Sequence, residues 1–170
     1  MNAKLLSLIA VLAALAMPAA RAEGVGEADL KAAFLLNFAR YIQWPADAFT
    51  SADAPLTIGV IGNAQVATVL SGLVSGERAG SHPIAVQQSA AKGCHIVFVG
   101  GSGAPEAFAG RACLTVGDSE DFLRRGGAIR FFTGADRKMR FEINPRAIER
   151  ARLKPSGTIM RLARIATDGR

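Results

Sequence analysis

The sequence is poor in the side chains that carry most enzyme chemistry. Its 170 residues include two cysteines, two histidines, one tryptophan and one tyrosine, and aromatic residues make up 6% of the chain. No HxxH, HExxH or CxxC spacing is present, so the usual metal-binding patterns are missing. Half of the residues are hydrophobic and 20% are charged, which excludes a disordered tail, a collagen-like repeat and a disulfide-dense miniprotein. We expect one α/β-sized domain.

Long hydrophobic runs are also scarce, and none after residue 22 approaches the eighteen residues of a membrane span. Residues 1–22 resemble a secretory signal, because Lys4 precedes a short apolar stretch that ends in the cleavage-site pattern ARA. We therefore predict a signal peptide at 1–22 and one exported domain at 23–170, located in the periplasm of a bacterium with two membranes. An uncleaved anchor is the alternative. Export disfavours a nucleic-acid partner despite the net charge of +6.

Strand-like and helix-like segments alternate along the predicted domain. A stripe at spacings of three and four predicts an amphipathic helix that ends at Trp44-Pro45; it consists of Leu30, Ala33, Phe34, Phe38, Tyr41 and Ile42. Strands are predicted at 56–61, 84–86, 95–99, 114–116 and 128–132, with helices at 64–74, 104–109 and around Phe122. This order predicts an α/β fold, a Rossmann-like three-layer sandwich whose mostly parallel sheet is flanked by helices.

The C-terminal part has a different pattern. Residues 133–136, TGAD, are typical of a hairpin turn and predict an antiparallel addition to the sheet. Asn144 before Pro145 predicts the start of a helix, with Ala147, Ile148 and Ala151 on one face. A last helical pattern follows at Ile159, Leu162, Ala163 and Ala166.

Charge is divided unevenly along the chain. Residues 23–123 hold five basic and ten acidic side chains, whereas residues 124–170 hold thirteen basic and four acidic ones. This asymmetry is typical of a surface that meets an acidic partner or anionic lipid headgroups. A solvated face without a partner is the alternative.

We find no catalytic pair. Cys94 and His95 are neighbours on a predicted strand, where adjacent side chains point to opposite faces. Asp118 and the acidic residues after it are explained as a helix cap, with paired acid–base carboxylates as the weaker alternative. The glycines at 100–103 fit a tight turn, or a site for a small anion. No catalytic residue, cofactor or metal is therefore assigned.

The two cysteines begin consecutive predicted strands. If these strands are parallel neighbours, Cys94 and Cys113 lie side by side at a separation that suits a disulfide. An exported chain meets oxidising conditions, so we predict this disulfide, with two buried thiols as the alternative.

Several stretches together resemble the YfiR-like family of periplasmic proteins. The first is KAAFLLNFARYIQWP at 31–45. The resemblance continues through IGVIG at 58–62, CHIVFV at 94–99, LTVGD at 114–118, GGAI at 126–129, FEIN at 141–144, LKPSG at 153–157 and RLA at 161–163. The ordered set covers nearly the whole predicted domain.

The resemblance implies a periplasmic, often dimeric regulator. Such a regulator binds the periplasmic domain of an inner-membrane diguanylate cyclase and holds it inactive. An OmpA-like outer-membrane lipoprotein sequesters the regulator, which raises cyclic-di-GMP and biofilm formation. Relatives serve other membrane sensors, so an adaptor for a histidine kinase or a small-molecule sensor is the alternative function. An enzyme ranks last.

The resemblance also implies a partner-binding stretch. Glu142 and Ile148 match positions in it, and Leu153 and Met160 are nearby apolar candidates. Each of these residues could instead belong to the core, and for Ile148 the two interpretations carry equal weight. Trp44 and Asn144 are better explained as a packing anchor and a helix cap.

Overall fold

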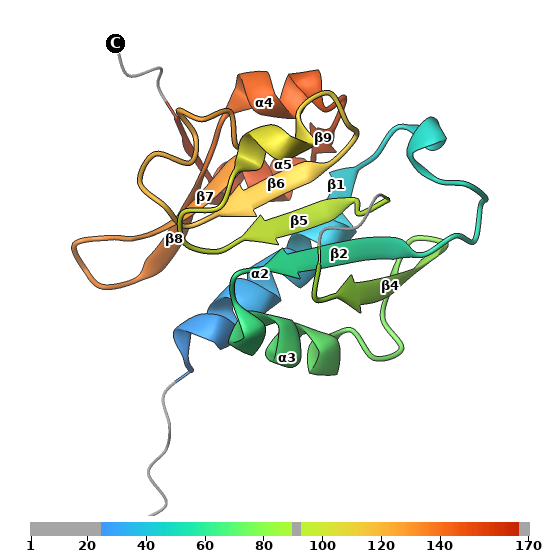
Figure 1. Cartoon of the computed structure of the whole chain (residues 1–170), viewed down its shortest axis with the longest axis horizontal. Coiled ribbons are helices and arrows are strands. Elements are labelled where there is room, and N and C mark those ends of the chain that lie inside the picture. The colour runs from blue at the N-terminus through green and yellow to red at the C-terminus, as the bar shows by residue number, and fades with distance from the viewer. Residues whose placement is uncertain (1–24, 90–92, 167–170) are drawn as a thin grey trace, which may run out of the picture.

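A computed structural model describes residues 25–89 and 93–166. Figure 1 shows a twisted sheet with helices packed against it. The signal peptide predicted at 1–22 lies outside the described residues. Within those ranges, no helix is long and apolar enough to cross a bilayer.

The main sheet has eight strands in the order β10-β8-β7-β6-β5-β2-β4-β3. Strands β4, β2, β5, β6 and β7 are mutually parallel, β8 is antiparallel to β7, and β10 is parallel to β8. This confirms the predicted Rossmann-like α/β sandwich with an antiparallel C-terminal addition. The strands are β2 (Leu56–Ile61), β3 (Arg78–Ala79), β4 (His82–Gln87), β5 (Ile96–Val99), β6 (Leu114–Gly117), β7 (Ile129–Thr133), β8 (Met139–Ile143) and β10 (Arg164–Ile165).

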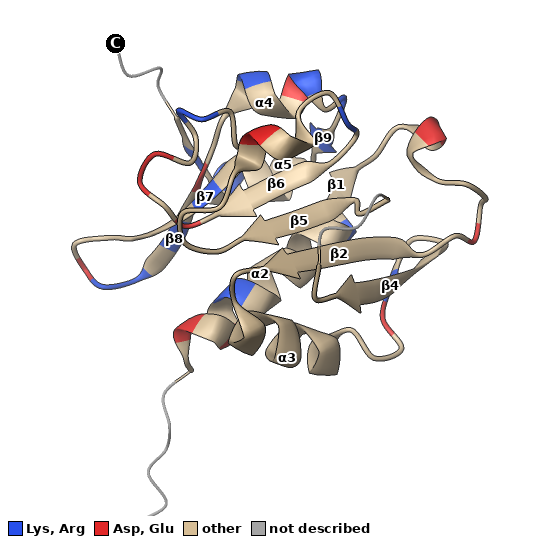
Figure 2. Ribbon diagram, in the orientation of Figure 1, with Lys and Arg blue, Asp and Glu red and all other residues tan. Residues whose placement is uncertain are grey.

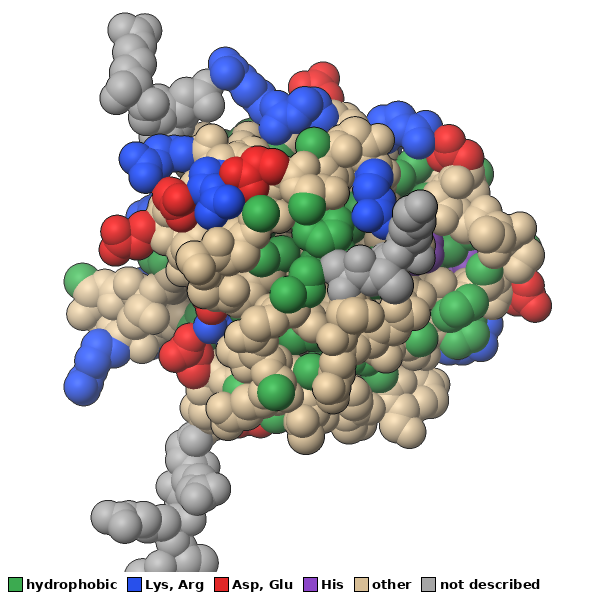
Figure 3. All heavy atoms as spheres, viewed as in Figure 1, with side chains coloured by type: hydrophobic (Ala, Val, Ile, Leu, Met, Phe, Trp, Pro, Cys, Tyr) green, Lys and Arg blue, Asp and Glu red, His purple; other side chains and the backbone are tan. Residues whose placement is uncertain are grey.

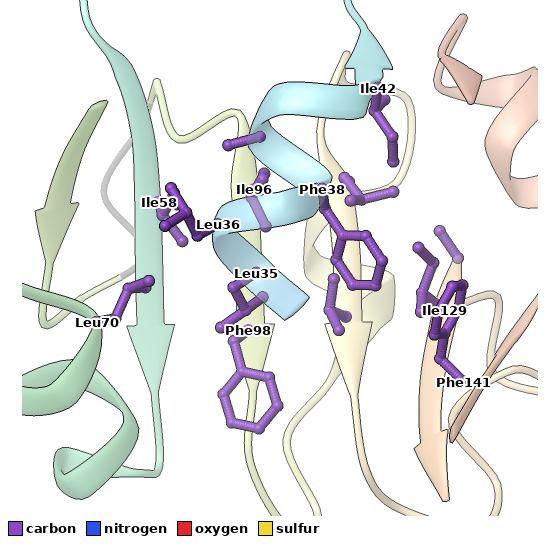
Figure 4. Packing of buried hydrophobic residues seen from close by; sticks show 14 of the residues in the cluster. Leu35, Leu36, Phe38, Ile42, Ile58, Leu70, Ile96, Phe98, Ile129 and Phe141 are labelled. Atoms are coloured by element: carbon purple, nitrogen blue, oxygen red, sulfur yellow. The ribbon is translucent and has the colours of Figure 1, made fainter. Parts of the chain in front are cut away.

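The helix α2 (Glu27–Tyr41) lies across the sheet and forms most of the core with it. Figure 4 shows Leu35 and Phe38 pointing from α2 toward side chains of the central strands. The Phe38 ring centroid lies 5.1 Å from that of Phe141, in an edge-to-face contact. The helix α3 (Ala64–Leu73) packs beside α2 and begins at Asn63, whose Oδ1 accepts a hydrogen bond from Val66 N.

The buried face of α2 is rotated from the predicted stripe. Leu30 and Tyr41, expected in the core, are exposed, whereas Lys31 is buried. The cause is electrostatic, because the Lys31 ammonium lies 2.6 Å from carboxylate oxygens of both Glu27 and Asp118. Lys31 therefore occupies a core position on α2. Because a lysine is normally expected at the surface, the sequence pattern did not show which face of the helix is buried.

The opposite face of the sheet carries a smaller cluster that includes Phe108 and Phe122. The helix predicted around Phe122 is wrong, since residues 120–126 form consecutive turns. The fully buried Phe122 ring fills the space beside two glycines, where a Cβ on Gly117 or Gly127 would lie 2.4 or 2.3 Å from it. The predicted helix at 104–109 is a single 3-10 turn, η3 (Pro105–Phe108).

The C-terminal elements lie on the side of the molecule away from α3 (Figure 1). As predicted, Asn144 caps the helix α4 (Pro145–Arg150), with its Oδ1 accepting a hydrogen bond from Ala147 N. The strand β9 (Lys154–Pro155) pairs with β1 (Ile42–Gln43), directly after α2. The last helix, α5 (Gly157–Leu162), ends earlier than predicted, because residues 164–165 extend to form β10.

Candidate docking surface

Exposed apolar side chains gather near the end of the described chain. Met160 and Leu162 of α5 are 40% and 64% exposed, and Ile165 of β10 is 43% exposed. These are three of the seven large exposed apolar side chains in the described ranges. Three exposed apolar side chains within six residues make this segment a candidate protein-interaction site. We call Met160, Leu162 and Ile165 the α5–β10 surface.

The segment that carries this surface is fixed to the core at several points. Ser156 N donates to the carbonyl oxygen of Tyr41, and its Oγ accepts a hydrogen bond from Ile159 N at the start of α5. Ile159 itself is buried in the main core cluster. After α5, Ala166 N donates to Ile143 O at 2.8 Å. The exposed side chains are therefore displayed from an anchored backbone.

Glu142 holds β10 against the rest of the sheet. It is 7% exposed, and its two carboxylate oxygens contact the guanidinium groups of Arg130, at 2.6 Å, and Arg164, at 2.9 Å from Nε. The Arg164 guanidinium also lies 4.1 Å from the centroid of the Phe132 ring. Removing the Glu142 charge would leave a half-buried arginine without its carboxylate. Glu142 is therefore not part of the exposed surface, but it positions β10, which carries Ile165.

Basic side chains border this surface. Figure 2 shows Lys and Arg concentrated on β7, β8, α4 and β9, while β2, β5, β6 and α3 carry no charge. Lys154 and Arg161 are exposed, and no salt bridge in the described part of the chain involves them. A segment that exposes apolar side chains together with basic groups outside any salt bridge suits an acidic, partly apolar partner.

The four residues predicted to bind a partner do not form one exposed face. Ile148 and Leu153 are buried in the main core, as the alternative interpretation allowed, and Glu142 is buried in its ion pairs. Met160 alone of the four is exposed. Neither Leu162 nor Ile165 is among the residues predicted from the sequence to bind a partner. Leu162 enters only through the last helical pattern, and the arginines at 161 and 164 are the signal that this segment is exposed.

The glycine turn after β5 is occupied by a side chain of the same chain. Gly101 N donates to Asp118 Oδ1 at 3.0 Å, and Lys31 Nζ contacts the other carboxylate oxygen at 2.6 Å. Although burial opposes it, hydrogen bonding to Asp118 and Glu27 raises the pKa of Lys31, so the ammonium stays charged. Asp118 caps no helix, contrary to prediction. It fills the position that the sequence offered to a small anion.

The imidazole of His95 is fully engaged with the backbone. Its Nδ1 accepts a hydrogen bond from Thr57 N at 3.1 Å, and Nε2 lies 3.0 Å from the carbonyl oxygen of Ala48 in the turn η2 (Ala46–Ala48). Burial lowers the pKa of His95, which keeps the ring neutral. The Trp44 indole donates to His95 O, and its role as a packing anchor is confirmed. No proton acceptor remains on His95 for a neighbouring thiol.

Cys94 and Cys113 belong to one buried cluster, but the structure contains no disulfide between them. Burial raises the pKa of the Cys113 thiol to about 12, so it is not a thiolate nucleophile at neutral pH. The pairing of these cysteines stays a prediction. Within the described ranges, no three His, Cys, Asp or Glu side chains are placed to hold a metal ion.

A protein-family model matches the chain. The family model described as YfiR/HmsC-like matches residues 28–164, which is most of the chain and includes both α2 and the α5–β10 surface up to Arg164. A search of curated proteins found no significant match.

Proposed function

Since the chain belongs to the YfiR/HmsC-like family, we propose that it is a periplasmic regulator that binds the periplasmic domain of an inner-membrane diguanylate cyclase and holds the enzyme inactive. Family membership supports a regulatory role in cyclic-di-GMP signalling in general, and favours regulation over catalysis. The partner, the repression and the compartment are the proposal.

The α5–β10 surface is the observation that carries this proposal. It combines exposed Met160, Leu162 and Ile165 with bordering basic groups, on a segment that the core holds in place. A binding protein regulates a receptor if it has different affinities for the active and inactive states, and it needs no catalytic group to do so. A cyclase domain with an acidic rim around an apolar patch would complement this surface.

Release of the cyclase follows from competition for the same surface. An OmpA-like outer-membrane lipoprotein that covers the α5–β10 surface would prevent cyclase binding, because two partners cannot occupy one patch. In the proposed scheme this raises cyclic-di-GMP. A homodimer is compatible with the scheme only if it leaves the α5–β10 surface uncovered.

The compartment is tested by fractionation. The full chain, expressed with its own residues 1–22, is expected in the osmotic-shock fraction at the size of residues 23–170. Recovery in the cytosol, or at full length in the membrane pellet, would contradict export with cleavage.

The partner is tested by affinity capture from inner-membrane extract of the bacterium that carries the chain. The native chain is expected to enrich a diguanylate cyclase, and Leu162→Asp to lose it. Leu73→Asp is the matched control, because Leu73 is a leucine 42% exposed at the end of α3, far along the sheet from β10. Capture of a histidine kinase instead, or equal capture by Leu162→Asp, would overturn the proposal.

A further inference from the structure

A pocket separate from the α5–β10 surface lies between η3 and α4. Its floor comes from β6 and the residue before β7, and its volume is about 120 Å³. The space exists because the facing side chains are small: Ala128, Ala147 and Ala151 are all buried and present only methyl groups. Phe108 closes one wall. This part of the wall is therefore apolar, while Cys113 and Thr115 on the floor contribute polar atoms.

The rim of this pocket is positively charged. Arg111, Arg125 and Arg150 line it, against the single carboxylate of Glu106. Glu106 is already bound by Arg125 through contacts of 2.7 and 3.1 Å. In the described residues no carboxylate forms a salt bridge with Arg111 or Arg150. The rim therefore keeps two guanidinium groups with unused donors.

The walls are held in place without a ligand. The Arg125–Glu106 pair ties η3 to the turns at 120–126, and Arg125 also donates to Gly103 O. Arg111 stacks over the Phe108 ring, with its guanidinium carbon 5.7 Å from the ring centroid. The Cys113 thiol on the floor stays neutral, because burial raises its pKa to about 12. In the view of Figure 3, hydrophobic side chains show at the centre of the face, with Lys and Arg around them.

From this arrangement we propose that the pocket binds a small aliphatic monocarboxylate, with its alkyl chain among the alanines and its carboxylate against Arg111 and Arg150. A pocket of this volume has room for roughly three or four carbon atoms beside the alanines. Inorganic phosphate would place oxygens against the alanine methyl groups, which cannot form hydrogen bonds, and a nucleotide is too large. A ligand of this size binds with a Kd in roughly the millimolar range.

Calorimetry or NMR titration of the full-length exported chain with sodium butyrate tests the site. Sodium chloride is added so that the ionic strength stays constant during the titration. Butyrate is expected to bind saturably, and n-butanol, which lacks the charge, at least tenfold more weakly. Arg150→Gln, an exposed position, is expected to weaken butyrate binding about tenfold. Arg137→Gln in the β7–β8 turn is the matched control and is expected to change nothing.

A second variant tests the apolar interior. Ala147→Leu fills the cavity and is expected to abolish butyrate binding while native circular dichroism is retained. If that variant does not fold, Arg150→Gln still decides the question. The proposal is overturned if butyrate gives no saturable response up to 50 mM, about ten times the expected range, if n-butanol binds equally well, or if Arg150→Gln binds butyrate like the native chain.

Discussion

The parallel core and the C-terminal segment from α4 to β10 use their apolar side chains differently. In the core, α2 and the central strands bury nearly all of them, and the buried charge of Lys31 is neutralised by two carboxylates. In the C-terminal segment, Ile148, Leu153 and Ile159 are buried while Met160, Leu162 and Ile165 face solvent among arginines. Folding explains the first group. The second group adds nothing to the core, and we propose that it contacts another molecule.

The two regions also differ in what their ion pairs do. Lys31, Glu27 and Asp118 join α2 to the end of β6 and close the glycine turn. Glu142 instead ties the edge strand β10 to β7 through two arginines. The first network stabilises the fold, whereas the second determines where an exposed surface lies. The two regions should therefore respond differently to substitution.

The largest loss of stability is expected from Phe38→Ala in the core. The Phe38 ring is fully buried and contacts Phe131 and Phe141, so its removal leaves a cavity worth about 3–5 kcal/mol in the free energy of unfolding. Urea denaturation measures this. Leu162→Ala is the comparison, and it is expected to leave the unfolding midpoint nearly unchanged. An equal loss of stability in Phe38→Ala and Leu162→Ala would contradict the distinction between a core region and an exposed surface.

Glu142→Gln is expected to cost about 2 kcal/mol, because Arg130 loses its carboxylate in a half-buried position. The effect should be local as well. In hydrogen exchange the amide of Ala166, which joins β10 to Ile143, is expected to lose protection first. Asp136→Asn, which breaks the exposed pair with Arg140, is the control without an expected change. Unchanged exchange at Ala166 would show that Glu142 does not position β10.

Much of the fold could be predicted from the sequence, because apolar runs and turn residues are local signals. The strand at 56–61 matches β2, and the Asn144 cap was recognised from the proline after it. The stripe on α2 could not be placed correctly, since the partner that permits a buried Lys31 is Asp118, 87 residues away. The helix predicted around Phe122 was wrong for a similar reason. The turns there are set by packing of the Phe122 ring against two glycines, which no local sequence pattern reveals.

A pH effect of about 1 kcal/mol, the scale of one hydrogen bond, is expected from His95. Burial holds its pKa below the ordinary value of about 6.5, so the unfolded chain binds the proton more readily than the folded one. The contribution of neutral His95 to the free energy of unfolding is complete above about pH 6.5, the ordinary pKa, and is lost as the pH falls below that value. Protonation would also turn Nδ1 from an acceptor for Thr57 N into a donor.

The check is the urea midpoint measured from pH 8 to pH 5. The native chain is expected to lose stability below about pH 6.5, and His95→Gln to lose less over the same interval. His82→Gln serves as the comparison, since His82 lies on the other side of the Phe49 ring. An identical pH profile for the native chain and His95→Gln would contradict this assignment.

The candidate site was harder to predict than the fold. The sequence shows the basic segment, and Met160 is exposed as a partner-binding residue must be, but the sequence could not separate buried from exposed apolar residues within 148–165. Ile148 and Leu162 have similar hydrophobicity, and the difference in their burial arises because α5 ends at Leu162 and β10 turns back to pair with β8. At that pairing Glu142 of β8 contacts Arg164 of β10 and also Arg130 of β7, a contact that no local sequence signal reveals.

The smallest effect on stability and the largest on signalling are expected from Leu162→Asp. The most direct measurement is cellular cyclic-di-GMP in the bacterium that carries the chain, with Leu162→Asp or Leu73→Asp introduced on the chromosome. If the α5–β10 surface holds the cyclase inactive, Leu162→Asp raises cyclic-di-GMP to the level of a deletion strain, while Leu73→Asp stays at the native level. A native level in the Leu162→Asp strain, with the protein present in normal amount, would contradict the account.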